Sequence, residues 1–102
     1  MVKHIVVWDH GDNFSAEQKA KNAEIIKKEL EALKGVIPGL VKIKVYSNMI
    51  DGSNVDLLLD STFESKAALD AYITHPAHVK AATEFVRPVV KNRRCADFED
   101  GE

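Results

Sequence analysis

Val2-Lys3-His4-Ile5-Val6-Val7-Trp8 is the first apolar run of the chain, and its β-branched composition is typical of a β-strand. Successive side chains of a strand point to opposite faces of a sheet. Ile5 and Val7 therefore share one face, Val6 and Trp8 share the other, and both faces are apolar. A strand of this kind indicates a sheet that is covered on both sides.

A second strand with two apolar faces is expected at residues 55–63, where three leucines follow one another at 57–59. Residues 40–46, by contrast, alternate apolar side chains with lysines, which predicts a strand at a sheet edge with one solvent-exposed face. A last alternating run predicts a strand at residues 93–99. Cys95, the only cysteine, is expected to be a small buried residue of that strand.

Helical periodicity fills the two long gaps between these strands. Ser15 and Gln18 form a capping-box signature, and apolar residues then recur at spacings of three and four as far as Leu33. A second helix is expected from Ser65, but Pro76 must break it, because proline fits a first helical turn and not a helix interior. The resulting order is β-α-β-β-α-β.

This order is that of a ferredoxin-like α+β fold, in which four antiparallel strands carry both helices on one face. The 102 residues are expected to form one domain, residues 1–102, because they are too few for a second core. The helices cover only one side of the sheet, and a large apolar patch seldom faces water. The doubly apolar strands therefore predict a homodimer, with a second copy over the helix-free face.

The composition argues against several classes of partner. The formal net charge is -2, and the basic residues Lys91, Arg93 and Arg94 are followed at once by acidic ones, so we expect no nucleic-acid or phosphate-binding patch. No apolar run approaches the roughly 20 residues of a membrane span, and the first strand is too short for a signal peptide. These features predict a cytoplasmic protein without membrane association.

Three further segments give the chain a recognisable pattern. They are Tyr72-Ile73-Thr74-His75-Pro76-Ala77-His78-Val79, Phe85-Val86-Arg87-Pro88 and the pair Asp97-Phe98. Together with the first strand, and in this order, they resemble the stress-responsive dimeric A/B-barrel (Dabb) family. The resemblance covers nearly the whole chain. It implies a dimeric α+β barrel and a role in stress response, in a family with many members of unknown function.

The resemblance also implies candidate site residues. A plant branch of the family cyclises linear polyketides by aldol chemistry without metal or cofactor, and His78 matches its general base. Tyr72 matches a tyrosine that assists by hydrogen bonding, and His4 matches another pocket histidine. The branch has a further histidine where this chain has Leu57, and a tyrosine on the first helix where this chain has isoleucines. The same substrate is therefore not expected.

Helical spacing places His78 on the side of its helix that faces the sheet. There it either acts as a base, since an imidazole exchanges protons near neutral pH, or bonds a backbone carbonyl and fixes the helix junction. His75 and His78 have the spacing of a metal pair. Zinc usually takes three or four protein ligands, however, so we expect no metal and assign His75 to the helix cap.

A ligand pocket is expected between the sheet and the broken second helix. The break leaves room for a small apolar or aromatic molecule, and two imidazoles and a phenol would supply the polar contacts. The expected lining consists of His4, Trp8, Leu57, Leu59, Tyr72, His78 and Phe85. Two functions stay open: binding of a small molecule without turnover, and cofactor-free catalysis, cyclase-like or monooxygenase-like, with His78 as the base.

Overall fold

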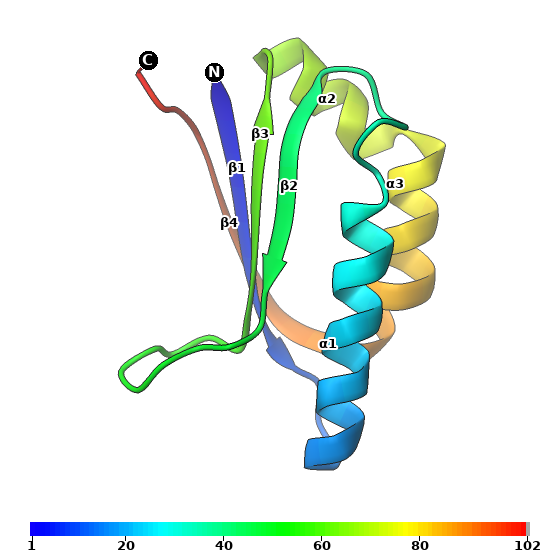
Figure 1. Ribbon diagram of the computed structural model, residues 1–102, viewed down its shortest axis with the longest axis vertical. Coiled ribbons are helices and arrows are strands. Elements are labelled where there is room, and N and C mark those ends of the chain that lie inside the picture. The colour runs from blue at the N-terminus through cyan, green and yellow to red at the C-terminus, as the bar shows by residue number, and fades with distance from the viewer. Residues whose placement is uncertain (102) are drawn as a thin grey trace.

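The computed structural model describes residues 1–101 as a four-stranded antiparallel sheet that carries helices on one face (Figure 1). The strands lie in the order β2-β3-β1-β4, so β1 and β3 are central and β2 and β4 are the edges. This arrangement confirms the ferredoxin-like α+β prediction. The strand bounds are β1 Val2–His10, β2 Leu40–Tyr46, β3 Leu57–Phe63 and β4 Val90–Glu99.

The first helix, α1 (Ala16–Glu31), begins at the predicted capping box. The Ser15 hydroxyl accepts from the Gln18 backbone N–H at 3.1 Å, and the Gln18 side chain accepts from the Ser15 backbone N–H at 2.8 Å. Both bonds satisfy amides that the helix itself leaves unpaired. Gly35 follows the helix with φ 86°, a conformation that glycine adopts without steric cost.

The second helical region is broken, as predicted, at His75. This residue has extended backbone between two helices, and its Nδ1 accepts from the Ala77 backbone N–H at 3.1 Å, which makes it the cap expected from the sequence. Among residues 1–101, no helix has the length and apolar character needed to cross a membrane. The four segments of this region are α2 Lys66–Thr74, α3 Pro76–Ala81, the π-helical turn η1 Ala82–Val86 and the 3₁₀ turn η2 Arg87–Val89.

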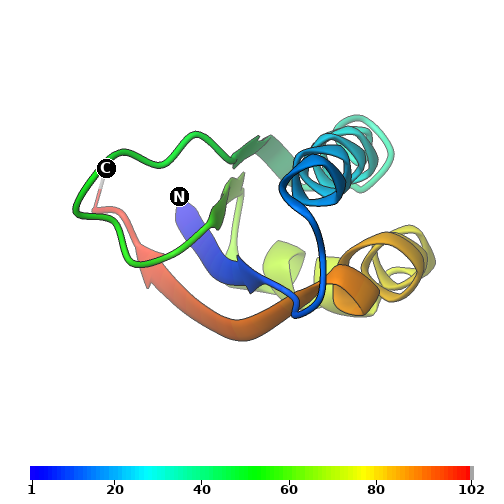
Figure 2. The ribbon, with the colours of Figure 1, turned by 90° about the horizontal axis from the view of Figure 1, so that it is seen from below.

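The two faces of the central strands have different surroundings. Val6 and Trp8 of β1 point to the helices and are buried, whereas Ile5 and Val7 point to the other face and are only half-buried. Figure 2 shows this second face without a covering helix, and the loop between β2 and β3 projects on the same side of the sheet. Leu58 pairs with Val7 and belongs to this open face.

One residue of the edge strands differs from the expectation. Cys95 is exposed, although its position opposite Val6 puts it on the same face as that buried valine. The cause is its strand: β4 is the edge strand, and nearly all of its residues lie outside the cover of the helices. The alternation of the sequence predicted the strand but not its place at the edge.

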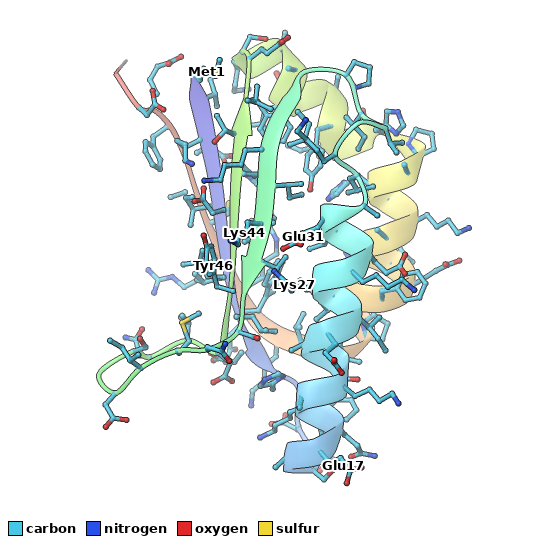
Figure 3. The ribbon with its side chains drawn as sticks, viewed as in Figure 1. Met1, Glu17, Lys27, Glu31, Lys44 and Tyr46 are labelled. Atoms are coloured by element: carbon cyan, nitrogen blue, oxygen red, sulfur yellow. The ribbon has the colours of Figure 1, made fainter. Side chains whose placement is uncertain are left out.

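The other edge, β2, is tied to α1 by two charged side chains (Figure 3). Glu31 accepts from the Val45 backbone N–H at 2.9 Å and from Lys27 Nζ at 2.7 Å. Lys27 Nζ also donates to the Val45 carbonyl at 3.2 Å. The outward-facing backbone groups of Val45 are therefore occupied, which disfavours pairing of this edge with another strand.

Candidate functional site

A cavity of about 360 Å³ lies between the helix-bearing face of the sheet and the broken second helical region. This size falls in the range of small-molecule sites. Six elements and two helical turns contribute to it, so residues far apart in the sequence meet there. The lining consists of His4, Val6, Trp8, Leu30, Leu59, Tyr72, Ile73, His78, Ala82, Val86, Arg87 and Arg93.

The structure brings most of the sequence-predicted pocket residues together but not all of them. His4, Trp8, Leu59, Tyr72 and His78 line the cavity. The remaining two, Leu57 and Phe85, do not line it. Leu57 pairs with Trp8 and is fully buried in the core.

Phe85 lies in a groove between α1 and the second helical region, beside Leu33 and Ala81. The cause is the π-helical turn η1, whose wider turn holds more residues than an α-helical one and shifts the following side chains around the axis. Ala82 and Val86, four residues apart, therefore face the cavity. The α-helical spacing counted from His78 selected Phe85 for this place.

His4 is held by a carboxylate on the neighbouring strand. The register of β1 and β4 places His4 opposite Asp97, and the Asp97 carboxylate bonds the Nδ1 atom of the ring. His4 is only 4% exposed, and its ring forms T-shaped contacts with the rings of Phe63 and Tyr72, whose centroids are 6.3 and 6.1 Å away. Asp97 thus fixes the orientation of the imidazole, and within residues 1–101 no carboxylate bonds its Nε2 atom.

Tyr72 supplies a buried hydroxyl to the cavity wall. The residue is 0% exposed, and its hydroxyl has no hydrogen-bond partner among residues 1–101. Burial raises the pKa of this phenol far above its ordinary value, so it stays protonated and can donate. A buried unpaired hydroxyl is costly, and in a residue that lines a cavity a ligand oxygen could satisfy it.

His78 makes the backbone bond that was one of the two alternatives from the sequence. Its Nδ1–H donates to the Ile73 carbonyl at 3.1 Å, across the break between α2 and α3. This bond fixes the tautomer in which Nε2 carries the lone pair. The ring lies against Tyr72 with centroids 4.2 Å apart, and burial lowers the pKa of His78, so the imidazole is neutral at pH 7.

Two arginines at the cavity were not singled out from the sequence as site residues. Arg87 comes from η2 and Arg93 from β4, and both side chains are exposed at the cavity. Arg93 belongs to the basic cluster at 91–94, and the acidic residues that follow this cluster argue against a binding patch at the level of composition. Its place on the same side as Trp8 depends on a strand register that composition does not reveal.

The histidines of the His-x-x-His pair have separate roles in the structure. The Nδ1 atom of His75 caps α3, and the Nδ1 atom of His78 bonds the Ile73 carbonyl. Within residues 1–101, no group of three or more His, Cys, Asp or Glu side chains is arranged to hold a metal ion.

The architecture and this cavity define a small ferredoxin-like α+β domain, and comparison with known proteins gives its family. The stress responsive A/B barrel domain matches residues 2–100, and the chain belongs to that family. It is 34% identical over 89 residues to the stress-response A/B barrel domain-containing protein HS1 of Arabidopsis thaliana, covering 83% of this chain and 77% of that protein.

Two solved structures show the same fold. A dimeric protein of unknown function from Bacteroides fragilis, also ferredoxin-like, is 34% identical, with a TM-score of 0.87 over 96% of this chain and 94% of that one. The At3g17210 protein of Arabidopsis thaliana is 26% identical, with a TM-score of 0.75 over 100% of this chain and 97% of that one.

Proposed function

We propose that this stress responsive barrel domain binds a small, flat, largely apolar molecule in the cavity between sheet and helices. The observation that carries the proposal is Tyr72, a cavity residue whose buried hydroxyl has no partner among the described residues. The cavity walls combine an indole, aliphatic side chains and a few convergent polar groups, which is the usual make-up of a small-molecule site.

The only tryptophan of the chain makes this proposal directly testable. Trp8 lines the cavity, so its single indole N–H resonance reports on ligand binding there. We expect a saturable shift of this resonance when the protein is titrated with aromatic amides and acids of naphthalene size, such as 3-hydroxy-2-naphthamide and 3-hydroxy-2-naphthoate.

A matched pair of variants checks that the shift comes from the cavity. Ala82 lines the cavity, whereas Ala71, beside the cavity residue Tyr72, is exposed and is not among the lining residues. Ala82→Phe should fill the space and abolish the shift, whereas Ala71→Phe should leave it unchanged, provided that circular dichroism shows both variants folded. If neither compound shifts the resonance of the wild-type protein, the binding function is wrong.

We also propose that the chain is a homodimer that buries the helix-free face of its sheet. Ile5, Val7 and Leu58 form an apolar strip on this face that the helices leave open. The similar protein from Bacteroides fragilis is described as dimeric. Sedimentation equilibrium at micromolar concentration should return twice the 11.3 kDa mass of the chain.

The proposed setting is the cytoplasm. Cys95 is a free and exposed thiol, a state that persists in a reducing compartment. Fractionation of the native cells should recover the protein with soluble cytoplasmic markers, and its recovery with secreted proteins would contradict this part of the proposal.

One observation favours a second function, cofactor-free catalysis with His78 as the general base. The bond from His78 Nδ1 to the Ile73 carbonyl leaves a lone pair on Nε2, and the lowered pKa keeps the imidazole neutral and able to accept a proton. Such a base would remove an acidic C–H proton next to a carbonyl group.

Deuterium exchange at the acidic carbon of a β-keto ester tests this second function. Exchange faster than in buffer alone, lost in His78→Gln and kept in His75→Asn, would support it. The His75 variant is the matched control, because asparagine also caps helices and His75 is not among the cavity residues. No acceleration by the wild-type protein would leave binding without turnover as the function.

A further inference from the structure

The electrostatic character of the cavity is set by two arginines. Arg87 donates only to the Thr83 hydroxyl at 3.3 Å, and neither Arg87 nor Arg93 has a carboxylate partner within residues 1–101. No Asp or Glu side chain is among the cavity residues that the structure describes. Asp97, behind His4, is already bonded to that ring.

Arg93 is placed at the cavity by an irregularity of the strand pairing. Val7 pairs with Arg94, and Asp9 pairs with Lys91. Between these pairs the single residue Trp8 lies opposite two residues of β4, Asn92 and Arg93, which is a β-bulge. Asn92 has φ 57°, a left-handed conformation that asparagine tolerates better than most residues. Such a bulge re-aims neighbouring side chains, and here Arg93 lines the cavity together with Trp8.

The field of both arginines reaches into the cavity. Burial is the main reason that the pKa of His78 is lowered, and the positive charges of Arg87 and Arg93 lower it further. Arg93 also opposes the rise of the Tyr72 pKa. Two separate rings in the cavity wall therefore lie within the electrostatic range of the guanidinium groups.

The Tyr72 hydroxyl is an independent sign of a polar ligand. It belongs to a residue that lines the cavity, and it is buried and unpaired among the described residues, so we infer that it is available to a ligand oxygen. A purely hydrocarbon ligand would leave this donor unsatisfied. Both the charge at the arginines and the donor in the wall therefore select for oxygen-bearing, electron-rich molecules.

We propose that the cavity takes a small aromatic anion, specifically a ring carboxylate. Its ring would lie against Trp8 and Leu59, a ring oxygen would accept from Tyr72, and its carboxylate would lie between Arg87 and Arg93. Planar guanidinium groups match a planar carboxylate in two-bond geometry. This inference rests on the proposed binding function and names the chemical class of its ligand.

Isothermal titration calorimetry with a matched pair of compounds tests the inference. 3-Hydroxy-2-naphthoate and 3-hydroxy-2-naphthamide have nearly the same shape, and only the first carries a negative charge. At low salt the wild-type protein should bind the carboxylate at least about tenfold more tightly than the amide, as expected for charge-assisted bonds. Raising the salt concentration should reduce this preference at the exposed guanidinium groups.

Variants separate the role of the two arginines from general charge effects. Arg87→Gln and Arg93→Gln should each lower the affinity for the carboxylate by several-fold and leave that for the amide unchanged. Lys80→Gln is the control: it removes the same charge from an exposed residue of α3 that is not among the cavity residues, and it should change neither affinity.

The outcomes distinguish this inference from the function on which it rests. Equal affinity for the two compounds in the wild-type protein would refute the anion site and leave the binding function intact. A preference that Lys80→Gln reduces as much as Arg93→Gln would also refute it, because the effect would then come from net charge. Binding of neither compound would refute both proposals.

Discussion

Replacing Tyr72 by phenylalanine should make the unliganded protein more stable and its ligand complex weaker. The hydroxyl is fully buried without a partner among residues 1–101, and an unpaired buried polar group costs about 1–3 kcal/mol. Phenylalanine keeps the ring and its contacts with Phe63 and His78, whose centroids lie 4.9 and 4.2 Å away. We therefore expect the free energy of unfolding to rise by about 1–2 kcal/mol.

Urea denaturation followed by circular dichroism measures this change. The protein concentration must be the same for all variants, since the stability of a dimer depends on it. Tyr46, the other tyrosine of the chain, is 42% exposed, and Tyr46→Phe should change the stability by less than about 0.5 kcal/mol. In a thermal scan the Tyr72 variant should melt roughly 4–8 °C higher per kcal/mol gained.

The affinity of Tyr72→Phe for 3-hydroxy-2-naphthamide should fall by about tenfold, which corresponds to one lost hydrogen bond. Opposite effects on stability and binding are typical of a group that is kept for function. A Tyr72→Phe protein that is less stable than wild type would show that the hydroxyl already has a partner in the free protein. The assignment of this group to ligand binding would then be refuted.

Two further predictions concern other parts of the molecule. Leu58→Lys puts an unpaired charge on the helix-free face, and burying such a charge costs several kcal/mol. Sedimentation equilibrium of this variant should therefore return the 11.3 kDa monomer. A dimer at micromolar concentration would contradict the proposed interface. Folding lowers the pKa of His78 from its ordinary value of 6.5, so the imidazole binds a proton more tightly in the unfolded chain. The contribution of His78 to the stability is therefore complete above about pH 6.5 and is lost as the pH falls through the lowered pKa of the folded chain. His78→Gln should flatten the pH dependence of the unfolding free energy in that range, and an unchanged curve would contradict the lowered pKa.

The parts of the fold that follow from local chemistry were predictable from the sequence. The capping box at Ser15 and the helix break at Pro76 depend on residues close to each other in the chain. The sides of the sheet were also predictable, because alternation alone assigns Leu57 and Leu58 to opposite faces. The fold class followed from the succession of elements and the short list of folds that accommodate it.

The errors at the site arise where local periodicity changes without a clear signal. Phe85 was assigned to the cavity by α-helical spacing, and a single π-helical turn directs Val86 there instead. The position of Arg93 depends on a strand bulge at Asn92, and the bond from Asp97 to His4 depends on the register of strands 93 residues apart in sequence. Bulges and register are settled by packing of the whole sheet, which one sequence does not show.

The most direct test of the central claim is a crystal structure of the protein with 3-hydroxy-2-naphthoate. The account predicts electron density in the cavity, with the ring against Trp8 and a ligand oxygen about 3 Å from the Tyr72 hydroxyl. The carboxylate should lie between the guanidinium groups of Arg87 and Arg93. A cavity closed by side chains, or a compound bound only outside it, would contradict the claim that this space is a small-molecule site.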